Sequence, residues 1–195
     1  VKTNPTLEHI RQTIDSSRII VSTTASLATH TAIFSIKHFE VAIIDEASQI
    51  LEPNIVGLLA AHNEGEQVID KFILIGDHKQ LPAVVQQDNN ESAADSPLLE
   101  EIHLPNCANS LFERLILTER AAGRTDFIGT LRKQGRMHPD IAAFPNTYFY
   151  EREQLECVPL AHQTEPSLPY NEPSEDKTDD FLKEHRMVFI PSKSC

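Results

Sequence analysis

The chain has 195 residues, of which 40% are hydrophobic, and a formal net charge of -12 at pH 7. This length can bury one full hydrophobic core or parts of two, and the apolar fraction is that of a globular protein. The acidic balance excludes a generally basic nucleic-acid-binding surface, because phosphate binding depends on lysine and arginine, although it leaves room for a local site.

The three cysteines, Cys107, Cys157 and Cys195, are odd in number and far apart, and none forms a CxxC pair. They suggest neither a disulfide framework nor a zinc site, and they favour a cytoplasmic location. No apolar run approaches the roughly 18 residues that span a bilayer, so we expect no membrane segment. The abrupt beginning and end of the chain suggest a piece of a longer protein.

In the first half of the chain, helical and strand patterns alternate. Apolar spacing and turn residues predict a helix over residues 7–15, a strand over 18–23, a loop entering a helix over 24–34, a strand over 39–45, a helix over 53–62 and a strand over 71–75. Three buried strands with helical connections indicate an α/β fold, a parallel sheet with helices on both faces. The handedness of such connections puts all three carboxyl ends at one edge.

The second half predicts a further α/β unit. Ser110 caps a helix over residues 110–117, and residues 120–124, which contain Ala-Ala-Gly, form a linker. Strands are expected over 127–131 and 186–190 and a short helix over 139–144. A segment rich in proline, serine and acids, residues 165–180, has no periodicity and is expected to be a flexible insertion.

Two strand exits carry the residues that point to chemistry. The run VAIIDEA, residues 41–47, ends on Asp45 and Glu46, and KFILI is followed by Gly76 and Asp77 and then by Gln80. At such a sheet edge an aspartate can hold Mg²⁺, a glutamate can polarise a water molecule, and a glutamine amide can sense a terminal phosphate. Taken singly, the Asp-Glu pair is equally consistent with a strand turning into solvent, and the run from Gly76 favours a structural turn.

The run LRKQGRMHPDI, residues 131–141, joins three cations and a glutamine to a helix that begins with proline. Arg136 has the bidentate guanidinium that can contact a phosphoryl group during transfer. His138 precedes Pro139 at the expected helix start, so a structural role is favoured over that of a general base. The other histidines show no ligand spacing that predicts a metal cluster.

Together these runs resemble the superfamily 1 helicases of the subgroup that includes senataxin and the nonsense-mediated-decay helicase, over Ser22 to about Leu155. The matching motifs occur in the family's order. They are residues 22–26, 45–49 with 52–53, 76–82, 110–115, and 134–139 with 144–146 and 149–150. One such match is weak, but five in order make coincidence improbable.

The resemblance implies a RecA-like P-loop NTPase fold. Residues 1–119 would form the C-terminal half of the first RecA-like domain, 120–124 the linker, and 125–195 the start of the second, with a flexible acidic insertion near 160–184. It also implies ATP and Mg²⁺ as cofactors and single-stranded DNA or RNA as the partner, without indicating protein partners.

The resemblance further implies a role for each matching side chain. Asp45 would hold Mg²⁺, commonly through water, Glu46 would activate water, Gln80 would sense the γ-phosphate, and Arg136 would contact it from the second domain. The remaining assignments are nucleotide binding by Gly76, Asp77 and Gln134 and contact with the nucleic-acid backbone by Thr23, Thr24 and Ser26.

The chain departs from the family pattern in three ways. Gly135 replaces a tyrosine that lies against the nucleotide base in the family, and Ala83 replaces a second proline. No GxxxxGK[ST] phosphate loop occurs in the 195 residues, so we expect this polypeptide to hydrolyse ATP negligibly and its parent protein to hydrolyse it. The alternatives are an inactive nucleic-acid-binding or scaffold protein with a helicase fold and a different phosphate-loop NTPase.

Overall fold

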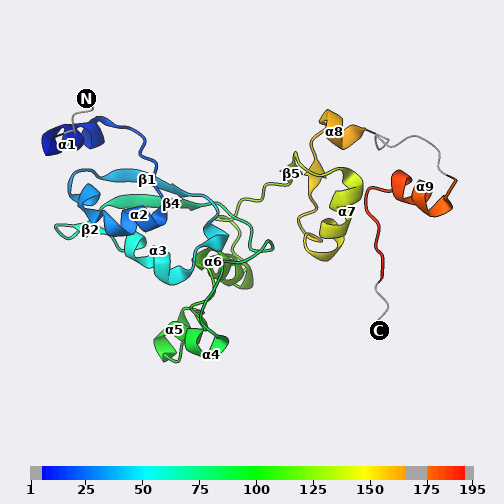
Figure 1. Cartoon of the computed structure of the whole chain (residues 1–195). Coiled ribbons are helices and arrows are strands. Elements are labelled where there is room, and N and C mark those ends of the chain that lie inside the picture. The colour runs from blue at the N-terminus through cyan, green and yellow to red at the C-terminus, as the bar shows by residue number, and fades with distance from the viewer. Residues whose placement is uncertain (1–5, 166–174, 192–195) are drawn as a thin grey trace. The chain divides into compact units, whose positions relative to one another are not determined.

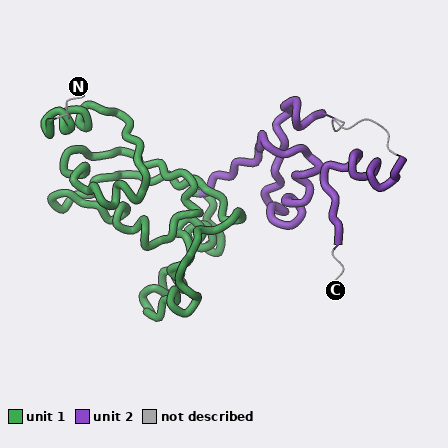
Figure 2. Tube along the Cα trace, in the orientation of Figure 1, with its two compact units in different colours: residues 1–127 green, residues 128–195 purple. Residues whose placement is uncertain are grey.

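The computed structural model describes residues 6–165 and 175–191. The chain divides into two compact units, residues 1–127 and 128–195, which are coloured separately in Figure 2. Figure 1 shows the elements of both. Among the described residues, no helix has the length and apolar character needed to cross a bilayer.

Unit 1 is built on two parallel strands, β1 (Phe39–Ile44) and β4 (Ile69–Leu74) (Figure 1). Between them the chain forms η2 (Ala47–Gln49), α3 (Glu52–Leu59) and a hairpin of β2 (His62–Asn63) and β3 (Glu66–Gln67). The other elements of the unit are α1 (Leu7–Ser16), α2 (Thr24–Thr29), η1 (Thr31–Ser35), α4 (Asn89–Ser92), α5 (Pro97–Glu101) and α6 (Leu111–Ala121).

The core of unit 1 lies on one face of this sheet. Ile44 of β1 and Ile55 of α3 are 6% and 1% exposed, and Leu111 of α6 packs with them. The opposite face carries Ile43, which is 66% exposed, and Ile73, which is 43% exposed. Within the described residues, helices therefore cover the face that contains Ile44, and the other face remains open.

Unit 2 contains a smaller parallel pair, β5 (Lys133–Gln134) and β6 (Glu156–Cys157), joined through α7 (Pro139–Tyr148). Helix α8 (Ala161–Thr164) follows β6, and α9 (Lys177–Glu184) comes later. The Asn146 side chain ties α7 to the chain before β6, donating to the Leu155 carbonyl at 2.9 Å and accepting from its N–H at 2.8 Å. The unit is thus an α/β crossover.

The structure confirms the α/β class and the parallel pairing of the strands at 39–45 and 71–75. It also confirms the helices that begin at Leu7 and Pro139 and the serine cap of α6, where the Glu113 N–H donates to Ser110 Oγ at 3.2 Å. The helix predicted to reach His62 ends at Leu59, because His62 pairs in the hairpin.

Three predicted strands are wrong. Residues 18–23, 127–131 and 186–190 are irregular, and no neighbouring strand in the described chain offers them a hydrogen-bonding ladder. Their apolar side chains face solvent, and Val21, Leu131 and Phe189 are 91%, 88% and 88% exposed. Apolar alternation alone does not make a strand, because the backbone groups also need a partner.

The expected linker is in part a helix terminus. Helix α6 continues to Ala121, and the Arg124 guanidinium folds back onto Glu119 through bonds of 2.7 and 2.6 Å. This hydrogen-bonded pair lowers the pKa of Glu119. At the expected flexible insertion, α8 and α9 occupy the described ends, and residues 166–174 lie outside the described residues.

Candidate active site

The carboxylates of Asp45 and Glu46 follow β1 directly at its carboxyl end. Both residues are exposed, and the Glu46 N–H donates to Asp45 Oδ1 at 3.0 Å. Glu46 has φ 53° and ψ 36°, a left-handed conformation that is uncommon for a residue other than glycine. Gln49 Nε2 donates to Glu46 Oε2 at 3.4 Å. Strained backbone of this kind concentrates at functional sites, so Glu46 is a candidate catalytic group.

The loop after β4 lies at the same edge of the sheet. Ile44 is paired with Leu74 in parallel register, and the pairing continues beyond the strands, since the Ala47 N–H donates to the Ile75 carbonyl at 2.8 Å. Gly76 comes next, and a Cβ there would lie 2.8 Å from the Ser48 backbone nitrogen. The turns after the two strands therefore touch, and only glycine fits at their contact.

Asp77 organises the rest of this loop. Its N–H donates to Ser48 Oγ at 3.1 Å, and its carboxylate accepts from the Lys79 N–H and from Gln80 Nε2, each at 3.0 Å. The structure thus brings Asp45, Glu46, Gly76, Asp77 and Gln80 together at one sheet edge. Ser48 joins the two loops, a contact that sequence analysis missed although the residue lies inside the 45–49 motif.

The predicted nucleic-acid contacts lie at the start of α2. Thr23 is its N-cap, and its hydroxyl oxygen accepts from the Ser26 N–H at 3.1 Å. Thr23 and Ser26 are exposed, whereas Thr24 is half-buried. A hydroxyl that accepts one bond still has its own hydrogen to donate, so capping leaves Thr23 able to contact a phosphate.

In unit 2, Gln134 holds the loop that carries Arg136. Gln134 Oε1 accepts from the N–H groups of Arg136 and Met137 at 2.9 and 2.7 Å, and its Nε2 donates to the Met137 carbonyl at 2.9 Å. The amide of Gln134, the predicted nucleotide-binding residue, therefore bonds to the backbone of its own loop and stabilises the loop conformation. Arg136 itself is exposed.

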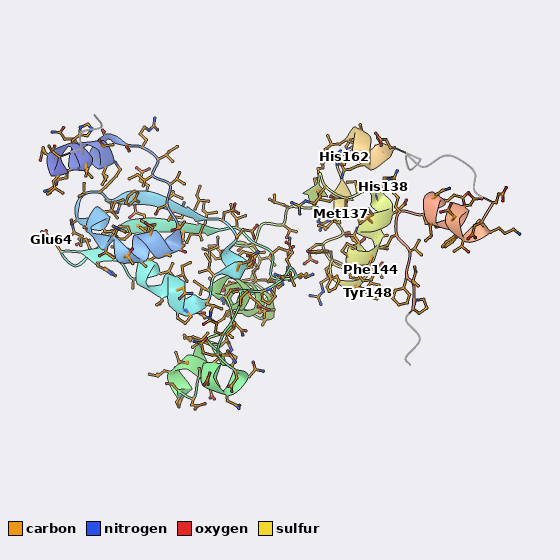
Figure 3. The ribbon with its side chains drawn as sticks, viewed as in Figure 1. Glu64, Met137, His138, Phe144, Tyr148 and His162 are labelled. Atoms are coloured by element: carbon orange, nitrogen blue, oxygen red, sulfur yellow. The ribbon has the colours of Figure 1, made fainter. Side chains whose placement is uncertain are left out.

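His138 caps α7, as the structural interpretation expected. The Asp140 N–H donates to His138 Nδ1 at 3.2 Å, and Figure 3 shows His138 with Met137 at the start of that helix. Farther along α7, the rings of Phe144 and Tyr148 lie 4.8 Å apart between centroids. In the part of the chain that the structure describes, no group of three or more histidine, cysteine, aspartate or glutamate side chains gathers to hold a metal.

Comparison with known proteins assigns the family. Two family models described as AAA domain match residues 3–88 and 107–194. DNA polymerase alpha-associated DNA helicase A of Saccharomyces cerevisiae is 32% identical over 143 residues, 72% of this chain and 19% of that protein. The chain belongs to the superfamily 1 helicases.

Two further relatives agree with this assignment. The DNA replication ATP-dependent helicase/nuclease DNA2 of Gallus gallus is 35% identical over 137 residues, 70% of this chain and 11% of that protein. Probable helicase MAGATAMA 3 of Arabidopsis thaliana is 35% identical over 150 residues, 76% of this chain and 15% of that protein. The chain thus spans less than a fifth of the length of each relative named here.

Gly135 stands where the resemblance to superfamily 1 helicases implies a tyrosine. A Cβ built there would lie 3.5 Å from Leu160 Cδ1, which is an ordinary van der Waals contact, and the residue does not have a positive φ. The local structure therefore does not require glycine.

Proposed function

We propose that this chain supplies the catalytic carboxylates and an arginine-bearing loop of an ATP-dependent helicase that moves along single-stranded nucleic acid. The observation that supports this best is the parallel register of β1 and β4, because it carries Asp45, Glu46 and Gln80 to one sheet edge. Ligands of open α/β sheets bind outside that edge. The relatives are several times longer than this chain, so the remaining parts of the ATPase would lie elsewhere in a longer protein.

The two units would belong to successive RecA-like domains. Unit 1 would be part of the first, with its carboxylates on the nucleotide, and unit 2 would be the start of the second. In this arrangement Arg136 would contact the γ-phosphate when the domains close. Hydrolysis would then release that contact and let the domains reopen.

The residues at the edge of β1 suit a magnesium nucleotide. Asp45 would hold Mg²⁺ through water, since the ion favours carboxylate, water and phosphate oxygens. Bound Mg²⁺ would neutralise charge on the β- and γ-phosphates. Glu46 would accept a proton from the attacking water, and Gln80, held by Asp77, would present its amide to the γ-phosphate.

The single strand of nucleic acid would pass the first turn of α2. Thr23, Thr24 and Ser26 would donate hydroxyl hydrogen bonds to phosphates, which position a strand without reading its sequence. Two of the relatives named above are called DNA helicases or DNA replication helicases, which supports DNA as the polymer. The cytoplasmic location remains a prediction from the cysteines.

The test is an ATPase assay with a charge-matched control. In the longer protein, Glu46→Gln should lower kcat about 10² to 10⁴-fold, the range expected for loss of a general base. Glu40→Gln makes the same charge change on an exposed residue near the opposite end of β1 and should leave kcat unchanged. The isolated 195-residue chain should show no measurable turnover. If the isolated chain shows Mg²⁺-dependent ATP hydrolysis that Glu46→Gln abolishes, the proposal that the remaining parts of the ATPase lie elsewhere in a longer protein is contradicted.

A protein that has kept the fold and lost turnover is the second candidate, and Gly135 favours it. Since a Cβ at this position makes only an ordinary van der Waals contact, Gly135→Tyr should restore the stacking surface that the family uses. Stacking of a base on an aromatic ring contributes about 1–3 kcal/mol, so ATP should bind roughly 5- to 150-fold more tightly in the longer protein. If the longer protein lacks ATPase activity with either residue, the scaffold function is the better account.

A further inference from the structure

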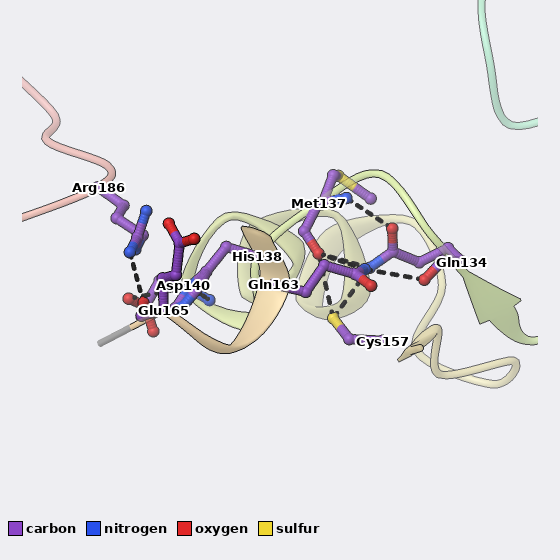
Figure 4. A network of polar contacts seen from close by, with 8 residues as sticks. All are labelled: Gln134, Met137, His138, Asp140, Cys157, Gln163, Glu165 and Arg186. Carbon is purple, nitrogen blue, oxygen red and sulfur yellow. Dashed lines mark hydrogen bonds and ion pairs between the residues drawn. The ribbon is translucent and has the colours of Figure 1, made fainter. Parts of the chain in front are cut away.

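The loop from residue 134 to residue 138, here called the arginine loop, is held from outside by a buried glutamine of α8. Gln163 is 1% exposed, and its Nε2 donates to the backbone carbonyls of Gln134 and Met137, both at 2.9 Å (Figure 4). These carbonyls belong to residues on either side of Arg136. A single amide group therefore bonds to both ends of the segment that presents the guanidinium.

Two neighbours of Gln163 complete the support. Cys157 Sγ donates to the Met137 carbonyl at 3.2 Å and accepts from Gln134 Nε2 at 2.9 Å (Figure 4). His162 Nε2 lies 2.9 Å from the Gly135 carbonyl. All three side chains come from residues 157–163, more than fifteen residues after the loop, so the loop geometry depends on a second segment of unit 2.

The orientation of the Gln163 amide follows from its contacts. With Nε2 facing two carbonyls, the amide donates both of its hydrogens, whereas a flipped amide would set its oxygen against two acceptors. In the described structure, Gln163 Oε1 is buried without a hydrogen-bond partner. A buried acceptor without a partner costs free energy, and an apolar side chain of the same length would avoid this cost. The two bonds that Gln163 donates therefore explain why a glutamine, and not an apolar residue, occupies this buried position.

We propose that Gln163 is a positioning residue for Arg136. This inference rests on the proposed function, in which Arg136 contacts the γ-phosphate. Because both flanking carbonyls are tethered, the loop loses little conformational entropy when the guanidinium binds, which favours the transition state over a freely moving arginine. Since Gln163 is buried and bonds to the loop backbone, it would act through the loop.

The first experiment measures loop order in the 195-residue chain by amide hydrogen exchange. Gln163→Met keeps the length of the side chain and removes both donors. It should speed exchange at Arg136 and Met137 at least tenfold while the buried Ala142 of α7 stays protected. Thr164→Ala is the matched control, since within the described residues this exposed hydroxyl of α8 donates to the carbonyls of Leu160 and Ala161 and not to the arginine loop. It should change neither exchange rate. Unchanged loop exchange, or equal acceleration at Ala142, overturns the positioning role.

The second experiment measures kcat and KM for ATP in the longer protein. Arg136→Ala should lower kcat, Gln163→Met should lower kcat about tenfold with little change in KM, and the double variant should match Arg136→Ala alone. The positioning role alone is refuted if the two substitutions lower kcat additively. It is also refuted if Gln163→Met leaves kcat unchanged while Arg136→Ala lowers it. An unaffected Arg136→Ala enzyme, or a longer protein without ATPase activity, refutes the proposed function, and loop exchange still decides whether Gln163 orders the loop.

Discussion

The buried ion pair between Arg114 of α6 and Glu52 of α3 offers a direct test of what stabilises unit 1. Arg114 Nε donates to Glu52 Oε2 at 2.8 Å, and its Nη2 donates to Oε1 in a bidentate pair. The side chains are 13% and 10% exposed. Arg114 Nη1 also donates to the Ile102 carbonyl at 2.7 Å, which ties the segment after α5 to α6. We predict that Arg114→Met strongly destabilises the unit.

The expected loss follows from two effects. Removing one partner of a buried pair leaves an uncompensated charge and costs about 3–5 kcal/mol. Loss of the bond to the Ile102 carbonyl adds about 1 kcal/mol. The sum is a large part of the roughly 5–15 kcal/mol that stabilises a typical domain. Since the chain has no tryptophan, unfolding in urea is best followed by far-ultraviolet circular dichroism.

A double variant separates the charge effect from the loss of packing. Replacing both partners by apolar residues is often neutral, so Arg114→Met with Glu52→Met should return to within about 1.5 kcal/mol of the native protein. Arg124→Met breaks the exposed pair with Glu119 and should leave the urea midpoint nearly unchanged. If the double variant is no more stable than Arg114→Met alone, the destabilisation does not come from a buried unpaired carboxylate.

Three other changes have defined outcomes. Gly76→Ala forces a Cβ against the Ser48 backbone nitrogen at 2.8 Å and should cost about 1–3 kcal/mol in urea unfolding, so full stability contradicts the close contact. Glu64 has φ 51° in the two-residue loop of the β2–β3 hairpin, so Glu64→Asn should stabilise by about 0.5–1 kcal/mol, and a lower urea midpoint refutes strain there. Arg124→Gln removes the bonds that lower the pKa of Glu119; this pKa, followed by NMR titration, should rise toward its usual value of 4.5, and the urea midpoint above that pH should fall only slightly because the pair is exposed.

The parallel sheet of unit 1 was predictable because its two strands are dense in β-branched residues and are bounded by a charged turn and a helix that starts with proline. Residues 18–23 have a similar composition but do not form a strand. The difference lies in pairing, since β1 and β4 satisfy one another's backbone while Ile19 and Val21 are 82% and 91% exposed. Whether a strand forms depends on distant residues, and the local pattern carries no information about them.

The same contrast applies to the site. That Asp45, Glu46 and Gln80 lie near one edge follows from parallel pairing, so order along the chain was enough to predict it. Gln163 is different, because it has no motif, sits on a four-residue helix, and meets the arginine loop only through backbone carbonyls. Every residue has a backbone carbonyl, so a hydrogen bond to a carbonyl does not depend on the side chain of the accepting residue. No residue of the loop could therefore indicate its partner.

The two parts of the candidate site consequently differ in how substitutions should affect them. In unit 1, the loops after β1 and β4 are direct continuations of paired strands. Close approach of Gly76 to Ser48 prevents the loops from moving closer, and the bond from the Asp77 N–H to Ser48 Oγ holds them together. In unit 2, the arginine loop is held by individual side-chain hydrogen bonds, in which Gln134 Oε1 accepts from the Met137 N–H and Gln163 Nε2 donates to the Met137 carbonyl. Each such bond contributes only about 1 kcal/mol. Changes around Arg136 should therefore alter loop order gradually, whereas changes at the Gly76 contact should disrupt the edge as a whole.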